Sequence, residues 1–145
     1  GKRLMSENHK VLAHALTRRC PLNHPTVCIR FEAFEKYGSY NPEHRNTQDY
    51  YLWINMVAKG AKLANLREPL LKFRRVDGFY KRRGRDKSIN ELKARFLAMR
   101  LLRQWSIFNV IYSLSVFTLR MMPASIIKLA YRLDRAIIHR ESKQK

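Results

Sequence analysis

Residues 46–60 read NTQDYYLWINMVAKG, and this stretch decides the expected fold. Between positions 50 and 57 the apolar side chains cover most of a helix circumference, which is typical of a buried helix rather than a surface one. Asn46 is the expected N-cap, which places Asp49 at the third helical position. Gly60 stands where a glycine commonly ends a helix. We therefore predict a buried helix that begins near Asp49.

Three short segments around this helix predict strands. TVCIRF (26–31) alternates and is rich in β-formers, and KLANL (62–66) and LLKFR (70–74) follow the helix. Short helical segments are expected at 8–19 and 32–37, the second ended by Gly38. The sequence therefore predicts an α+β fold. It is expected to be part of a larger domain, with a small sheet on which the buried helix packs.

The chain divides at about position 87, with one half-domain expected over 1–87 and basic amphipathic helices over 88–145. Ser88 and Glu91 form a capping-box pattern, and the helix that follows places Ile89, Leu92, Phe96 and Met99 on one face. The uncharged run 104–119 is shorter than the roughly 20 residues that span a bilayer. In the next predicted helix, Ile126, Leu133 and Ile137 lie opposite Lys128, Arg132 and Arg135, a pattern of helices in a membrane interface. We expect 104–138 to bind a membrane surface; burial of this face in the core or in a dimer is the alternative.

The composition points to anionic partners. The chain has 145 residues, with 30 Lys+Arg against 11 Asp+Glu and a formal charge of +19. Phosphate groups, acidic lipid headgroups and nucleic acid all fit this charge. Cys20 and Cys28 match no zinc spacing and indicate a reducing compartment, with a single disulfide as the alternative. The N-terminus has no apolar stretch of the kind that marks a signal peptide.

Asp49 is the leading candidate for chemistry. A carboxylate in the first turn of a buried helix is held rigidly, and the positive end of the helix dipole favours its charged form. Such a group can act as a general base. The alternative is that Asp49 only caps the helix, and the spacing alone does not separate the two.

Four motifs in order carry a resemblance to a known family. They are NHPTVCIRFEAFEKYGSY (23–40), TQDYYLW (47–53), KGAKLANLREPLLKFRR (59–75) and FYKRRG (79–84). Together they resemble the C-terminal half of bacterial family-2 (GT-A type) glycosyltransferases of the exopolysaccharide and O-antigen type, such as those of amylovoran biosynthesis. The resemblance is close over about residues 20–85 and loose beyond, and it implies that residues 1–87 are the acceptor-side half of a GT-A domain.

The resemblance implies an inverting transfer from a nucleotide-sugar to a saccharide or lipid-linked acceptor. Asp49 falls on the family's catalytic base, and Gln48 replaces the Glu that usually precedes it. His24 and Trp53 are implied at the acceptor site. The alternatives are a loop histidine bonded to backbone and a tryptophan packed in the core.

The resemblance also implies phosphate contacts. Arg74 and Arg75 end a predicted strand, and arginine suits bidentate phosphate binding. Arg82 and Arg83 are further candidates in a basic loop, for which a solvated surface is the alternative.

The family's Asp-x-Asp motif, which holds Mg²⁺ or Mn²⁺ under the donor diphosphate, does not occur in this sequence, and no metal ligands are assigned. We therefore expect a partial enzyme that needs a donor-binding half, from a missing N-terminal part or a partner such as a homodimer, and that transfers no sugar alone. The expected location is cytoplasmic, at the inner face of the membrane. A nonenzymatic nucleic-acid- or membrane-binding module is the competing hypothesis, although no nucleic-acid motif is present.

Overall fold

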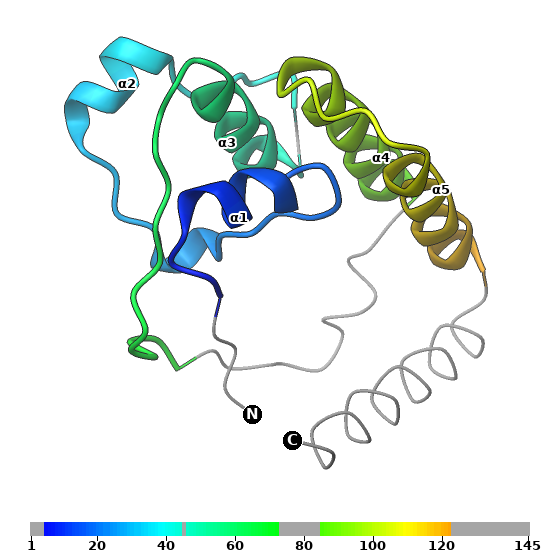
Figure 1. Cartoon of the computed structure of the whole chain (residues 1–145), viewed down its shortest axis with the longest axis horizontal. Coiled ribbons are helices and arrows are strands. Elements are labelled where there is room, and N and C mark those ends of the chain that lie inside the picture. The colour runs from blue at the N-terminus through cyan, green and yellow to red at the C-terminus, as the bar shows by residue number, and fades with distance from the viewer. Residues whose placement is uncertain (1–4, 45, 73–84, 123–145) are drawn as a thin grey trace.

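The computed structural model describes residues 5–44, 46–72 and 85–122. In chain order these form α1 (His9–Ala15), the 3₁₀ turn η1 (His24–Thr26), α2 (Phe31–Tyr37), α3 (Gln48–Ala58), α4 (Arg85–Leu101) and α5 (Ile107–Met121). Figure 1 shows α3 next to α4, with α5 on the far side of α4. This part of the chain is therefore a small bundle of helices.

The predicted sheet is wrong, because the described residues contain no strand. Val27 and Arg30 do have extended backbone angles, with φ/ψ of −82°/132° and −66°/137°. Alternation and β-propensity describe such a conformation, but a strand also needs a neighbour that completes its hydrogen bonds. None of the described segments pairs with 26–31, 62–66 or 70–72, and residues 73 and 74 lie outside the described part.

The segment predicted as the second strand lies against the start of the chain instead. The Leu63 N–H donates to Nδ1 of His9 at 3.1 Å, and Nδ2 of Asn65 donates to the Ser6 carbonyl at 2.9 Å. An ion pair joins Arg67 to Glu7. These polar contacts take the place of a sheet ladder.

The prediction of a buried helix after position 46 is confirmed, with a corrected beginning. α3 begins at Gln48, its N-cap is Thr47, and Asp49 is the second helical residue. Asn46 cannot be the cap, because its φ of 69° turns the chain through the left-handed region just before the helix. Gly60 ends the helix as predicted, with a φ of 99°. The N–H groups of Ala61 and Gly60 donate to the carbonyls of Met56 and Val57, which is the Schellman pattern.

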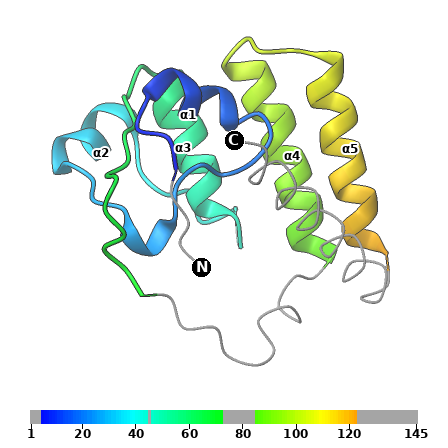
Figure 2. The same ribbon diagram turned by 60° about the horizontal axis from the view of Figure 1, so that its bottom comes forward.

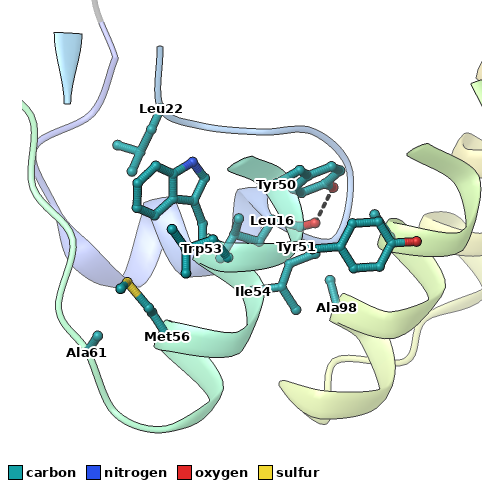
Figure 3. Close-up of a cluster of buried hydrophobic side chains, with 11 residues drawn as sticks. Leu16, Leu22, Tyr50, Tyr51, Trp53, Ile54, Met56, Ala61 and Ala98 are labelled. Carbon is teal, nitrogen blue, oxygen red and sulfur yellow. Dashed lines mark hydrogen bonds between the residues drawn. The ribbon is translucent and has the colours of Figure 1, made fainter. Parts of the chain in front are cut away.

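α3 supplies most of the hydrophobic core. Its buried residues are Tyr50, Tyr51, Leu52, Trp53, Ile54 and Met56. Figure 3 shows the Trp53 ring on the side of Leu22, and Tyr51 and Ile54 on the side of Ala98. Two side chains of α4, Ala94 and Ala98, are fully buried, and their small size lets α4 approach the large side chains of α3. The large side chains of α3 therefore pack against the face of α4 that carries the two alanines.

The predicted start and face of α4 both need correction. The helix already includes Arg85, so Ser88 is an interior residue and is buried, not a cap. Ile89 is 37% exposed, whereas Met99 is buried as predicted. The hydrophobic pattern favoured the larger side chains, but contact with α3 selects the face that carries the alanines.

α4 and α5 form a hairpin and lie side by side in both views (Figure 2). The turn depends on Arg103, which has a φ of 51° at a position where glycine is usual. The Gln104 N–H donates to the Met99 carbonyl at 2.9 Å, which closes the end of α4.

The outer face of α5 is apolar and exposed. Phe108 and Ile107 are 74% and 67% exposed, and Ile111, Leu114 and Leu119 share this face. Within the described ranges, no helix is long and apolar enough to cross a membrane. The amphipathic segment predicted after Pro123 lies outside the described residues. No disulfide joins Cys20 and Cys28.

Two tyrosine hydroxyls that tie α3 to its neighbours allow a matched test of this packing. The Tyr50 hydroxyl donates to the buried Leu16 carbonyl, whereas the Tyr51 hydroxyl donates to the Asn90 carbonyl at 3.2 Å in a partly exposed position. We expect Tyr50→Phe to lower the free energy of unfolding by about 1–3 kcal/mol, because it leaves a buried acceptor unsatisfied. Tyr51→Phe should cost less. Urea denaturation measures both, and equal costs would contradict this account of the core.

Candidate functional site

A charged cavity of about 260 Å³ lies at the N-terminal end of α3. Its lining comes from the turn after α1, from the first turn of α3 and the two residues before that helix, from α4 and from α5. The residues are Arg19, Cys20, Asn46, Thr47, Asp49, Tyr50, Lys87, Glu91, Arg95 and Arg120. Four of these side chains are cationic and two are anionic. Helices distant in the sequence thus bring a cluster of charge to one end of the buried helix.

Asp49 lies in the wall of this cavity and is half-buried. Its position in the first turn of α3 exposes the carboxylate to the positive end of the helix. Within the described part of the chain, the carboxylate takes part in neither a hydrogen bond nor an ion pair, so it does not cap α3 there. Asp49 therefore makes no capping hydrogen bond to the described residues, and its catalytic role stays a prediction.

The floor of the cavity is a buried ionic network centred on Arg95. The Arg95 side chain is 3% exposed; its Nε donates to the Arg18 carbonyl at 2.7 Å and its terminal nitrogen approaches Glu91 at 3.4 Å. Arg120 pairs with the same Glu91 oxygen. Burial lowers the pKa of Arg95, an effect that the neighbouring Tyr50 and Glu91 oppose. Burial also raises the pKa of Tyr50 far above its ordinary value, so its phenol stays neutral and donates to Leu16.

The turn that carries Arg19 is fixed from two sides. Nε of Arg18 donates to Oδ1 of the buried Asn109 on α5 at 2.7 Å, while the Arg18 carbonyl accepts from Arg95 on α4. The N–H groups of Arg18 and Arg19 both donate to the Ala15 carbonyl. The turn is thereby held beside the α4–α5 hairpin, with Arg19 at the cavity.

A second, more open hollow of about 430 Å³ adjoins the first and shares Asn46 with it. Its lining residues are Tyr40, Asn41, Pro42, His44, Asn46 and Gln48. The His44 ring stacks on Tyr51 with centroids 3.7 Å apart. Burial and then the negative charge of Asp49 raise the pKa of Tyr40. The hollow thus combines aromatic and polar side chains, and Tyr40 links it electrostatically to Asp49.

The structure brings three of the sequence-predicted residues to this end of α3. Asp49 lines the charged cavity and Gln48 lines the open hollow. His24 packs edge-on against Tyr40, with ring centroids 6.1 Å apart. Trp53 is placed elsewhere: its side chain is 1% exposed, so the ring offers no face to a sugar and the core interpretation holds. The four predicted phosphate contacts, Arg74, Arg75, Arg82 and Arg83, lie outside the described residues.

Sequence reasoning missed the cations of the cavity. Glu91 and Arg95 stand four residues apart on a helix, a spacing that predicts an ion pair but not its burial. Arg19 and Arg120 are about a hundred positions apart, and no local pattern connects them. Among the described residues, no three His, Cys, Asp or Glu side chains gather as a metal site would require.

Comparison with known proteins identifies relatives of one kind. The chain is 34% identical over 119 residues to an uncharacterized glycosyltransferase of Haemophilus influenzae, covering 79% of this chain and 42% of that protein. It is 31% identical over 135 residues to the amylovoran biosynthesis glycosyltransferase AmsE of Erwinia amylovora, covering 92% and 50%. It is 32% identical over 111 residues to the UDP-Gal:alpha-D-GlcNAc-diphosphoundecaprenol beta-1,3-galactosyltransferase of Escherichia coli, covering 74% and 39%.

The chain is therefore homologous to part of several bacterial glycosyltransferases, and it spans about half the length, or less, of these relatives. No protein-family model and no solved structure matches it.

The electrostatic link between Asp49 and Tyr40 can be measured. The charge of Asp49 disfavours the Tyr40 phenolate, so we expect Asp49→Asn to lower the pKa of Tyr40 toward its ordinary value. The contribution from burial should remain. Titration of ¹³Cζ-labelled tyrosines by NMR gives the value, and Tyr40→Phe assigns the resonance. An unchanged Tyr40 pKa in Asp49→Asn would show that the two groups are not close in solution.

Proposed function

We propose that this chain forms the acceptor side of an inverting, family-2 (GT-A type) glycosyltransferase of cell-surface polysaccharide synthesis, with Asp49 as the general base. The observation that carries the proposal is the Asp49 carboxylate. It is half-buried at a helix N-terminus, lines the charged cavity without a hydrogen bond or ion pair to another described residue, and interacts electrostatically with Tyr40 of the open hollow. Homology to named glycosyltransferases supports the reaction class.

In the proposed reaction, one Asp49 carboxylate oxygen accepts the proton of an acceptor hydroxyl. The hydroxyl oxygen bonds to the anomeric carbon of the donor sugar as the bond from that carbon to the nucleoside diphosphate breaks. Attack from the opposite face inverts the anomeric centre. The open hollow suits the acceptor saccharide, because Gln48 and Asn41 offer amide groups and Tyr40 and His44 offer ring faces.

The acceptor in this proposal is lipid-linked. The E. coli relative is named for transfer onto a diphosphoundecaprenol-linked sugar, which supports a polyprenyl diphosphate acceptor here. The nucleotide-sugar, and the divalent cation that the family resemblance implies, would be held by a donor-binding half. No Asp-x-Asp occurs in these 145 residues, and the chain spans about half of its relatives.

The proposal places the chain at the inner face of the membrane. The apolar face of α5 supports this location, because five large hydrophobic side chains are exposed on one side of a helix in a chain of charge +19. Basic residues near an anionic bilayer contribute about 1 kcal/mol each, and apolar side chains add to this by insertion.

The catalytic role is tested in a chimera that joins residues 1–145 to the part of the Erwinia enzyme outside the match. We expect the chain alone to transfer no sugar and the chimera to transfer it to a polyprenyl-diphosphate saccharide. Asp49→Asn in the chimera should lower turnover by about 10²–10⁴-fold, because the positioned base is lost. Circular dichroism checks that the variant is folded. Near-normal turnover of the folded variant would remove Asp49 from the mechanism.

Membrane binding is tested with two substitutions of matched exposure. Phe108 on α5 is 74% exposed and Leu66 in the loop after α3 is 72% exposed. Phe108→Glu should weaken co-sedimentation with vesicles containing anionic lipid, whereas Leu66→Glu should not, because only the first alters the α5 face. Binding should also fall as salt rises. If the wild-type chain ignores anionic vesicles at low salt, the membrane location is wrong.

A further inference from the structure

The cationic side of the charged cavity is not used by a base mechanism, and its charges are not balanced. Glu91 is shared between Arg95 and Arg120, so one carboxylate faces two guanidinium groups. Among the described residues, Arg19 and Lys87 are paired with no carboxylate. With Asp49 included, the six charged side chains of the lining sum to a formal +2. Such an excess in a partly enclosed space attracts an anion.

One hydroxyl in the wall also lacks a partner. Thr47 is 2% exposed, and its Oγ1 is buried without any hydrogen bond among the described residues. Buried polar groups are nearly always satisfied, and an exception in a cavity wall is a donor left for a ligand. This observation is independent of the charges, and it selects a ligand rich in acceptor oxygens.

We propose that this cavity is a diphosphate subsite. A diphosphate esterified at both ends, as in a nucleotide-sugar or a lipid-linked saccharide, carries one negative charge on each phosphate, which matches the formal +2. Its oxygens suit Arg19, Lys87, Arg120 and the Thr47 hydroxyl. The volume of about 260 Å³ is near the lower end of the roughly 300–1,000 Å³ of ligand pockets, as expected for a site that takes only part of a substrate.

The inference rests on the proposed function for its substrate and deepens it. A diphosphate in the charged cavity and a saccharide in the adjoining open hollow would place the acceptor across Asp49, because Asn46 lines both spaces. The diphosphate could come from a lipid-linked acceptor or from a nucleotide donor, and the two sources share the same chemistry.

Binding to the complete chain is measured by isothermal titration with three probes: inorganic pyrophosphate, farnesyl diphosphate and uridine diphosphate. We expect Arg19→Gln and Lys87→Gln each to weaken diphosphate binding by about 10-fold or more, because each removes a charge-assisted contact. Arg100→Gln and Lys93→Gln, exposed α4 substitutions outside the cavity lining, are the matched controls and should change binding less than about 2-fold.

Two further variants give results that general loss of positive charge would not. Thr47→Val keeps the shape of the side chain and should weaken binding by a few-fold without lowering stability, since the hydroxyl has no partner to lose. Asp49→Asn removes a like charge from the wall and should tighten diphosphate binding by a few-fold.

The probes separate the sources. Tighter binding of farnesyl diphosphate than of uridine diphosphate supports the acceptor, and the reverse order supports the donor as the source of the diphosphate. Absence of binding by all three probes, or equal effects of cavity and control substitutions, would overturn the subsite. Turnover of the Asp49→Asn chimera tests the base assignment and is measured independently of diphosphate binding. The subsite can therefore fail while the base assignment stands, and the base assignment can fail while diphosphate still binds.

Discussion

The buried guanidinium of Arg95 is the interaction on which the arrangement of the described helices depends. It donates to the carbonyl of Arg18 in the turn after α1 and to Glu91 on its own helix, and Glu91 in turn holds Arg120 at the end of α5. A charge placed at 3% exposure is costly unless several partners satisfy it. Because its direct partners come from the turn after α1 and from α4, these two elements must come together for the cost to be met, and Glu91 then links α5 to them through Arg120.

The same network determines what the cavity can do. Glu91 is occupied by two arginines, so it does not neutralise the remaining cations, and Asp49 on α3 faces them without a partner among the described residues. The hydrophobic packing of α3 against Ala94 and Ala98 sets where Asp49 lies relative to Lys87 and Glu91. Structural and functional roles are therefore coupled: a change that loosens the α3–α4 contact would also displace the carboxylate from its cationic surroundings.

The charged cavity and the open hollow at the N-terminus of α3 are each lined by one of two adjacent residues. Gln48 and Asp49 are consecutive, yet Gln48 lines the open hollow with Tyr40 and His44, while Asp49 lines the charged cavity. Successive residues at the start of a helix point about 100° apart, which allows one turn to serve two environments. A substrate with a saccharide joined to a phosphate has the same two-part character, and this correspondence is what links the proposed base to the proposed diphosphate subsite.

The sequence by itself determined the buried helix, its glycine stop and the candidate base, because these depend on local periodicity and on short motifs between residues 46 and 60. For Trp53 the sequence allowed either a sugar-stacking ring or a packed core residue. The side chain is 1% exposed, which places it in the core. The sheet was wrong because an extended, apolar segment such as 26–31 has the composition of a strand whether or not another strand is beside it. Arg19, Lys87 and Arg120 could not be connected from the sequence, since their proximity results from the packing of helices separated by up to a hundred residues. Only the tertiary structure decided that these charges meet beside Asp49, because a buried ionic network is satisfied by contacts that no local pattern specifies.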